Sequence, residues 1–230
     1  MDKAFTFEFG TPLVRWDFKG REKRFFIYGL LDGQVAHCAN TGSMLGLIPE
    51  AKGVWVTPYP PESGRKLLFG AEMMEMPDGT LVGINTMLPN KLAEGAIKAG
   101  LVPEVSGELK REVKFDAHTR FDLKVGETWI EVKNVTLGYD GVAVFPDAKT
   151  ERGAKHLREL QGIVEAGGKA LQIFMVQRGD CTTFRPADEI DPVYAATLRS
   201  AVKAGVQAIA LGCSLTETGI KVDRRLQIVL

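Results

Sequence analysis

The stretch TRFDLKVGETWIEVKNV, residues 119–135, has the pattern of two amphipathic strands joined by a tight turn. Gly126 and Glu127 suit the two central positions of a type II′ turn, in which glycine comes first. This turn pairs Val125 with Thr128 and thereby sets the register of a hairpin. Side chains alternate along a strand. The apolar face predicted by that alternation comprises Phe121, Leu123, Val125, Ile130 and Val132.

The polar face of the same hairpin carries two acids. The register pairs Asp122 with Glu131, with Cβ atoms about 4.5–5.5 Å apart, a separation at which like charges destabilise a sheet. A hard divalent cation, Mg2+ or Mn2+, would offset the repulsion, because such ions bind through carboxylates. Lys133 lies on this face, where it could position an attacking water or stabilise charge at phosphorus. The pattern suits metal-dependent phosphodiester hydrolysis.

Other charged residues extend or weaken this interpretation. Glu112, in REVKF, projects to the polar side of the preceding strand and would add a third acid to the metal site. Arg120, beside Asp122, is a candidate for contact with nucleic acid. An alternative stays open, in which Arg120 and Lys133 neutralise the two acids on an ordinary exposed sheet face. In the same way, Glu112 could be solvated and balanced by neighbouring basic residues.

The chain changes character near residue 86. Residues 1–85 contain short runs rich in β-formers, such as FTFEF, RFFIYGLL and GVWVTPYP, separated by turn residues, which predicts a small barrel or sandwich. From residue 86, helical patterns at 89–99, 150–166 and 191–205 alternate with apolar strand patterns. That rhythm predicts a mixed sheet with helices packed on it. The expected organisation is therefore a β-barrel domain, residues 1–85, followed by an α/β domain, residues 86–230.

Composition narrows the class of protein. The chain has 29 Lys plus Arg and 29 Asp plus Glu, so no net field draws the whole molecule to nucleic acid. The three cysteines are far apart in sequence, which supports neither a disulfide framework nor a zinc site and indicates a reducing compartment. No stretch approaches the roughly 18 apolar residues of a membrane-spanning helix. These features predict a cytoplasmic protein without a membrane partner.

Two further segments carry candidate phosphate-binding groups. In FPDAKTERGAKHLREL, the helix start presents free backbone N–H groups beside Arg152, Lys155 and His156, and Gly153 would let a phosphate approach closely. The alternative is that the basic residues pair with glutamates on a solvated helix face.

In AHCANTGSM, the residues His37, Asn40 and Thr41 occupy a loop after a strand, as in barrels that bind single strands. The alternative is a turn in which Asn40 and Thr41 satisfy local backbone groups. Aromatic residues of the first domain could stack bases, but alternating aromatics more often form a core. They are Phe5, Phe7, Phe9, Trp16, Phe18, Phe25 and Phe26.

Seven segments in order resemble one known family over nearly the whole chain. They are HCANTGSM, INTMLPNKL, REVKF, TRFDLKV, IEVKNVTL, FPDAKTERGAKHLREL and DPVYAATL. Together they are similar to the sugar fermentation stimulation protein A (SfsA) family. The resemblance implies an N-terminal OB-fold-like domain and a C-terminal domain similar to the PD-(D/E)xK nucleases. It also implies DNA binding without sequence preference and a regulatory role in sugar (maltose) metabolism.

The resemblance assigns roles to single residues. Asp122 matches the motif's first acid, Glu131 its second acid and Lys133 its lysine, while Glu112 resembles the additional acid before the hairpin. Ser43 stands where many members carry a basic residue, which weakens the expected contact of that loop with phosphate. The expected function is DNA binding with a Mg2+- or Mn2+-dependent nuclease-like site. The alternatives are a non-catalytic DNA-binding regulator and a binder of small nucleotides, and a homodimer stays open.

Overall fold

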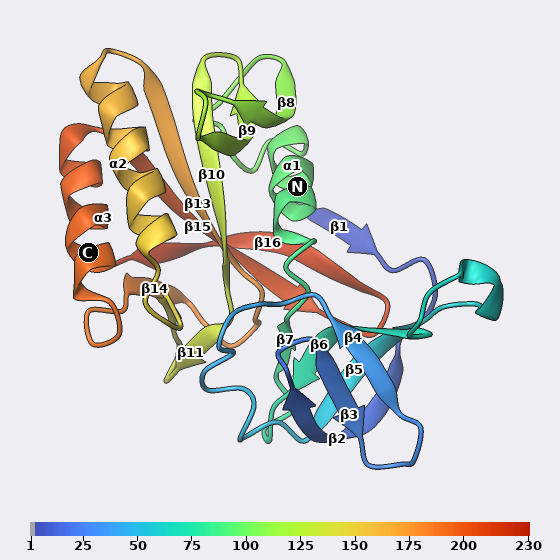
Figure 1. Ribbon diagram of the computed structural model, residues 1–230. Coiled ribbons are helices and arrows are strands. Elements are labelled where there is room, and N and C mark those ends of the chain that lie inside the picture. The colour runs from blue at the N-terminus through green and yellow to red at the C-terminus, as the bar shows by residue number, and fades with distance from the viewer. Residues whose placement is uncertain (1–2) are drawn as a thin grey trace.

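The hairpin of residues 119–135 lies in a ten-stranded mixed sheet of the computed structural model, which describes residues 3–230. Figure 1 shows this sheet with helices on both faces and a second, smaller β unit beside it. The strand order in the large sheet is β11-β12-β14-β16-β15-β13-β10-β9-β8, with β1 paired to β16. Two layers of helix around a mixed sheet agree with the predicted α/β domain.

The hairpin itself consists of β9 (Arg120–Val125) and β10 (Thr128–Val135). Val125 pairs with Thr128, which confirms the predicted turn and register, and Gly126 has a φ of 53° that suits a glycine. The predicted apolar face is wrong at one position. Phe121 packs beneath α2 with Leu160, whereas Leu123 faces the core on the α1 side. The reason is that the β9–β10 ladder ends at Leu123, so alternation does not continue through Asp122.

Parallel strands form the centre of the sheet. β10 runs parallel to β13 (Lys169–Val176), which in turn runs parallel to β15 (Gln207–Leu215). Alternate residues of β13 face opposite helices, since Ile173 and Met175 lie in the α1-side core and Phe174 and Val176 in the other. The remaining strands of this sheet are β8 (Leu109–Lys114), β11 (Leu137–Tyr139), β12 (Val142–Phe145), β14 (Thr183–Pro186) and β16 (Gly219–Ile228).

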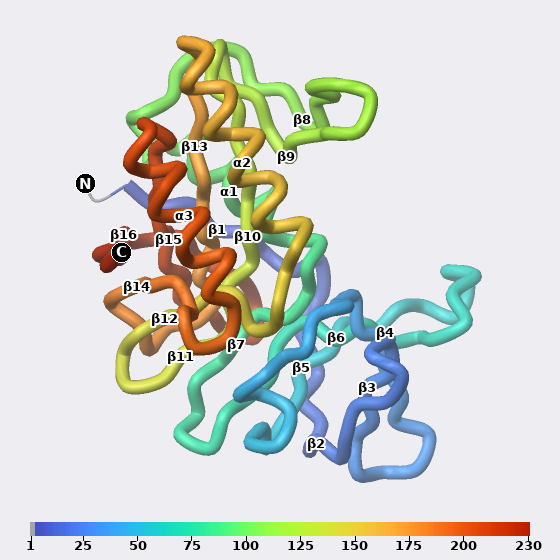
Figure 2. The backbone as a smooth tube through the Cα atoms, turned by 60° about the vertical axis from the view of Figure 1, so that its left-hand side comes forward, coloured from blue at the N-terminus to red at the C-terminus, as the bar shows by residue number. Residues whose placement is uncertain are grey.

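The three helices begin where the sequence predicts. α1 (Pro89–Lys98) covers one face, and α2 (Glu151–Glu165) and α3 (Pro192–Ala204) lie side by side on the other (Figure 2). Thr150 caps α2 by accepting a hydrogen bond from the backbone of Gly153, and Asp191 caps α3 in the same way. These two caps fix the start of α2 next to the strands that carry the acids.

The smaller unit is a closed six-stranded sheet. Its order is β4-β3-β2-β5-β6-β7, and an additional β4–β6 pairing joins the sheet into a barrel. The strands are β2 (Val14–Glu22), β3 (Phe26–Gly29), β4 (Val35–Cys38), β5 (Gly53–Pro58), β6 (Phe69–Glu75) and β7 (Leu81–Gly83), with a short 3-10 helix, η1 (Pro61–Ser63). Trp16, Ile27 and Val54 are in its core. Most of the aromatic residues considered as base-stacking groups are packed, and Phe25 is the most exposed large one, at 44%.

The first strand corrects the predicted domain limits. β1 (Phe5–Glu8) was expected in the barrel, but it pairs antiparallel with β16 of the large sheet. The ring of Phe5 lies against Gly95 of α1, where a Cβ atom would come within 2.2 Å of the ring. A local β pattern predicts a strand but not the sheet that the strand joins, because that choice depends on such long-range packing.

Two earlier expectations concern cysteines and membranes. Cys38, Cys181 and Cys213 are buried free thiols. No helix within residues 3–230 is long and apolar enough to cross a bilayer.

The contact between Phe5 and Gly95 can be tested with matched alanine substitutions. Gly95→Ala should lower the free energy of unfolding by about 1–3 kcal/mol, because the added methyl displaces the ring that anchors β1. Gly162→Ala in α2 is the control, since nothing lies within 4 Å of its added Cβ. That control should stabilise the protein by about 0.5–1 kcal/mol. Denaturant unfolding measures both, and equal stabilisation by the two substitutions would contradict the anchoring.

Candidate active site

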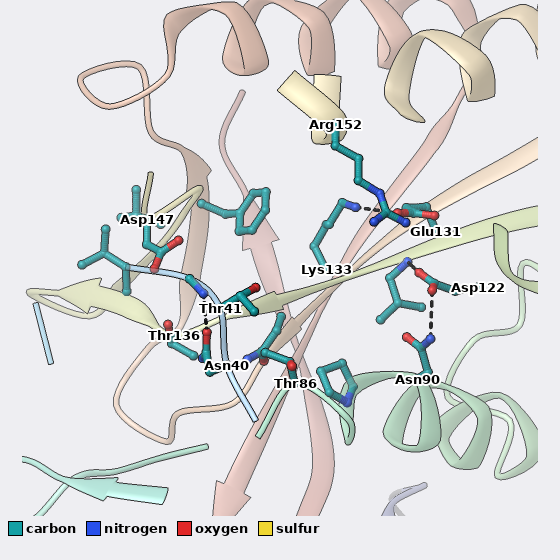
Figure 3. Close-up of a pocket in the computed structure, with 17 residues that line it drawn as sticks. Asn40, Thr41, Thr86, Asn90, Asp122, Glu131, Lys133, Thr136, Asp147 and Arg152 are labelled. Atoms are coloured by element: carbon teal, nitrogen blue, oxygen red, sulfur yellow. Dashed lines mark hydrogen bonds and ion pairs between the residues drawn. The ribbon is translucent and has the colours of Figure 1, made fainter. Parts of the chain in front are cut away.

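A pocket of about 420 Å³ opens where the barrel meets the large sheet. Figure 3 shows its two ends. At one end lie Asp122, Glu131 and Lys133 with Asn90 and Arg152. At the other lie Asn40, Thr41, Thr86, Thr136 and Asp147. The pocket is therefore built from both units, with the charged hairpin residues at one end.

Asp122 stands where β9 separates from β10. The ladder ends at Leu123 and Ile130, and the backbone N–H of Val132 donates instead to Asp122 Oδ2 at 2.8 Å. Asp122 Oδ1 accepts from Nδ2 of Asn90, in the first turn of α1, at 2.9 Å. The carboxylate thus takes the place of a ladder partner. The predicted opposition of the two acids in a regular ladder is replaced by this side-chain-to-backbone bond, which still keeps them adjacent.

Glu131 is buried, with 3% of its surface exposed. Its Oε1 accepts from Lys133 Nζ at 2.5 Å and lies 2.5 Å from Nδ1 of His156. Because a carboxylate can only accept, Nδ1 of His156 carries the proton. Within residues 3–230, the other oxygen, Glu131 Oε2, has no hydrogen-bond partner. A buried polar atom without a partner costs about 1–3 kcal/mol, so this oxygen is a candidate ligand atom.

The two acids have opposite pKa shifts. Burial raises the pKa of Asp122, and the negative charge of Glu131 raises it further. Burial also acts to raise the pKa of Glu131, but the hydrogen bond from His156 and the charge of Lys133 outweigh it and hold that pKa below its usual value. Neighbouring carboxyl groups whose pKa values are pushed apart are typical of acid–base sites.

Two cationic side chains accompany the acids. Lys133 is largely buried, with 16% of its side chain exposed, and Arg152 reaches over it from the first turn of α2 (Figure 3). Arg152 Nε lies 3.5 Å from Nε2 of His156, so the guanidinium extends the chain of contacts that begins at Glu131. This arrangement offers positive charge beside two carboxylates, which is what a phosphate and its cation require together.

Six residues predicted for the site line the pocket or contact it directly. Asp122, Glu131, Lys133, Arg152, Asn40 and Thr41 line it. His156 lies one layer deeper, where it bonds to Glu131 rather than to a ligand. Asn40 has both of its amide atoms engaged, donating to the carbonyl of Ile84 and accepting from the backbone of Gly42. Asn40 therefore satisfies local backbone groups, as in the alternative in which it forms part of a turn.

Four predicted residues lie elsewhere. Glu112 is exposed on β8, has a φ of 51°, and does not line the pocket, so the structure does not bring the third acid to the other two. Arg120 and His37 are exposed outside the pocket. Lys155 is exposed and lies 3.5 Å from Glu159, as in the solvated-face alternative. The left-handed backbone at Glu112 breaks the alternation from which its direction was predicted.

Gly153 has a different role from the one predicted. Its N–H donates to the Thr150 hydroxyl at 3.0 Å, so that N–H is not free for a phosphate. An added Cβ would lie 2.9 Å from Thr150 and 3.1 Å from Tyr194. The glycine is therefore explained by close packing between the two helix starts.

Among the residues that the sequence interpretation missed, three contact the acids or close the pocket. Asn90 binds Asp122, Gln172 donates to the Glu131 carbonyl at 3.0 Å, and Asp147 closes the far end. Asn90 and Asp147 fall inside the segments MLPNKL and FPDAKTER, next to a proline at an element boundary. Such positions could have been considered, but only the fold brings them to Asp122 and to the barrel.

The donor set for a metal ion is small. Across residues 3–230, no group of three or more His, Cys, Asp or Glu side chains is placed to hold an ion. The available ligands are the carboxylate of Asp122 and the free Oε2 of Glu131. Two carboxylates with open positions fit Mg2+ or Mn2+, since Mg2+ uses one or two carboxylates and keeps several waters.

Comparison with known sequences agrees with this architecture. Residues 20–84 match the family model described as the SfsA N-terminal OB domain, and residues 87–219 match the sugar fermentation stimulation protein RE domain. The chain belongs to the sugar fermentation stimulation protein family. This assignment confirms the predicted resemblance and fold class, including the OB fold of the barrel.

Members of this family with similar sequences align with nearly the whole chain. A sugar fermentation stimulation protein homolog of Rhodospirillum centenum is 46% identical, covering 96% of this chain and 98% of the relative. The homolog of Maricaulis maris is 43% identical, covering 97% and 99%. Among solved structures, Pyrococcus furiosus SfsA in complex with Ca2+ is similar with a TM-score of 0.85 and 27% identity, covering 100% of both chains.

The raised pKa of Asp122 predicts a stabilising substitution. A carboxyl group whose pKa is higher in the folded state favours folding below its unfolded pKa and loses that benefit as the pH rises through the folded value. At neutral pH the raised pKa of Asp122 therefore disfavours folding, and Asp122→Asn should raise the free energy of unfolding by about 0.5–2 kcal/mol, the usual scale of a stabilising substitution. The gain should disappear near pH 4. Thermal unfolding across this pH range measures it, and a loss of stability at pH 7 would contradict the assigned shift.

Proposed function

We propose that this protein binds DNA without sequence preference and hydrolyses phosphodiester bonds at the pocket containing Asp122, Glu131 and Lys133, with Mg2+ or Mn2+ as cofactor. The observation that carries the proposal is the free, buried Oε2 of Glu131 beside the carboxylate of Asp122. The solved relative described as a Ca2+ complex supports a cation in members of this fold. The family name and the predicted regulatory role connect such DNA binding to sugar metabolism.

The two acids would hold the cation. Asp122 is fixed for this task by two neutral donors, the Val132 N–H and the Asn90 amide, so neither bond neutralises its charge. Glu131 is kept ionised by His156 and Lys133, which leaves Oε2 available as an anionic ligand. The cation, when bound, lowers the pKa of a water and neutralises charge on a phosphoryl oxygen.

Lys133 and Arg152 would act on the phosphate. Lys133 Nζ already donates to Glu131 Oε1, which holds its ammonium at the pocket floor, and its remaining protons can bind the attacking water or a phosphoryl oxygen. Arg152 supplies donors from above, where its guanidinium can bind a nonbridging phosphate oxygen. His156 is a positioning residue, because it touches Glu131 and not the reacting groups.

Cleavage assays test this assignment with two isosteric substitutions. Linear, supercoiled and single-stranded DNA and RNA are incubated with Mg2+ or Mn2+ and the protein. Glu131→Gln should abolish cleavage, whereas Glu112→Gln, an identical change at an exposed acid outside the pocket, should retain it. Lys133→Ala should lower the rate by about 100-fold, the scale expected for removing one group that stabilises developing charge.

The outcomes separate the candidate functions. Cleavage that persists in both Glu131→Gln and Lys133→Ala would refute the proposed site. Binding of DNA without cleavage by the native protein would instead favour the non-catalytic regulator. The slope of log affinity against log salt then counts the phosphate contacts, since each contact adds about 0.9 to the slope for duplex DNA.

Cation binding has a readout that does not depend on activity. Mg2+, Mn2+ or Ca2+ should raise the thermal midpoint of the native protein, because a ligand that binds only the folded state at 100 times its Kd stabilises it by about 2.7 kcal/mol. Asp122→Asn and Glu131→Gln should show no such rise, while Glu112→Gln should behave as the native protein does. An equal rise in all four proteins would place the cation elsewhere.

A further inference from the structure

The loop of residues 39–44 forms the pocket wall that faces the acids. In Figure 3, Thr41 and Asn40 lie on one side of the pocket and Asp122 and Glu131 on the other. The loop follows β4, so the barrel provides one wall of a site whose charged residues all come from the large sheet and its helices. Access to the acids therefore depends on where this loop is held.

Three residues outside the loop hold it by its backbone. Every carbonyl of residues 39–42 accepts a hydrogen bond from outside the loop. Arg21 donates to the carbonyl oxygens of Asn40 and Gly42, at 2.6 and 3.1 Å. Arg24 donates to the carbonyl oxygen of Thr41 at 2.7 Å. Thr86 donates to the carbonyl oxygen of Ala39 through both its backbone N–H, at 3.1 Å, and its hydroxyl, at 2.5 Å. The loop is thus preorganised, and two guanidinium groups lie behind it.

Asp147 ties the same loop to the second unit. Its Oδ2 accepts from the Ser43 hydroxyl and from the Met44 N–H, both at 2.9 Å. The Ser43 hydroxyl also lies 2.8 Å from the Asp147 carbonyl oxygen. Asp147 follows β12 and lines the far end of the pocket. Asp147 therefore acts as a latch, meaning that its hydrogen bonds to Ser43 and Met44 hold the barrel loop in place across the pocket.

The pocket is small for a nucleic acid. A pocket of about 420 Å³ is in the size range of small-ligand sites. Glu131 lies deep inside it, with only 3% of its surface exposed. The reacting phosphate lies on the outside of a duplex, but a duplex is too stiff to bring one phosphate down into such a pocket, whereas a flexible single strand can follow a groove with its backbone. The geometry thus favours an unpaired strand over an intact duplex.

On the basis of the function proposed above, we infer that the latched loop restricts the site to single-stranded nucleic acid, with the strand passing between Thr41 and the acids. The exposed Thr41 hydroxyl and the arginine-backed loop would follow the sugar-phosphate backbone, which carries no sequence information. Asp147 is the residue that determines this specificity, by holding the loop rather than by touching the reacting groups.

The test compares four substitutions on one oligonucleotide, which is used as a labelled single strand and as a blunt duplex. Asp147→Ala removes the latch, and Ser43→Ala weakens it while leaving the Met44 bond. Asp147→Asn removes the same charge as Asp147→Ala but keeps an amide oxygen that can accept from both the Ser43 hydroxyl and the Met44 N–H. Glu127→Ala, at the exposed hairpin turn, controls for the loss of an acid elsewhere.

The native protein should prefer the single strand by about tenfold or more in kcat/KM, which corresponds to about 1.4 kcal/mol. Asp147→Ala should reduce that ratio by gaining activity on the duplex, and Ser43→Ala should shift it in the same direction. Asp147→Asn and Glu127→Ala should keep the native ratio. A native protein that cleaves duplex equally well would overturn the inference, as would an equal loss on both substrates in Asp147→Ala with no change of ratio.

Failure of the proposed function would be recognised separately. If the native protein cleaves neither substrate, fluorescence anisotropy without divalent cation measures the same ratio as dissociation constants for single strand and duplex. A tenfold preference that falls in Asp147→Ala would then support the inference while refuting the nuclease. Equal affinities in all variants would refute the inference itself.

Discussion

The buried carboxylate of Glu131 is the constraint around which the site is organised. It lies in an inner strand of the large sheet with only 3% of its surface exposed, so its charge must be balanced within the protein. Lys133 and His156 balance it from β10 and α2, and Arg152 contacts the histidine. The position of α2 against the sheet, fixed by the caps at Thr150 and Asp191, is what allows this balance.

The balance leaves one oxygen unused, and the structure supplies a second acid next to it. Asp122 keeps its charge beside Glu131 because the ladder opens there and a backbone N–H turns to the carboxylate. Both features cost stability, since a buried oxygen lacks a partner and burial beside Glu131 raises the pKa of Asp122. Two such costs at neighbouring residues that line one pocket are typical of a functional site.

The sequence predicted the elements of this site better than their assembly. The turn at Gly126, the helix starts at Thr150 and Asp191, and the adjacency of the two acids follow from rules that act within a few residues, and all are present. Glu112 could not be placed, because a left-handed residue interrupts its strand. Local periodicity also could not show that β1 joins the large sheet, or that Asp147 reaches the barrel loop, since both depend on contacts between distant segments.

The barrel contributes more than an additional binding surface. Its loop of residues 39–44 is held by Arg21, Arg24 and Asp147, so it completes a pocket that the α/β domain alone would leave open. The hydrogen bonds from Ser43 and Met44 to Asp147 fix the position of the barrel loop relative to the α/β domain. The position of this loop then determines how a substrate reaches the pocket.

Anomalous diffraction from crystals soaked in Mn2+ tests the central claim most directly. The account predicts one strong peak between the carboxylate of Asp122 and Oε2 of Glu131, and no peak there in Asp122→Asn crystals. Density for Mn2+ at another place with this position vacant, or a peak that persists in the variant, would contradict it.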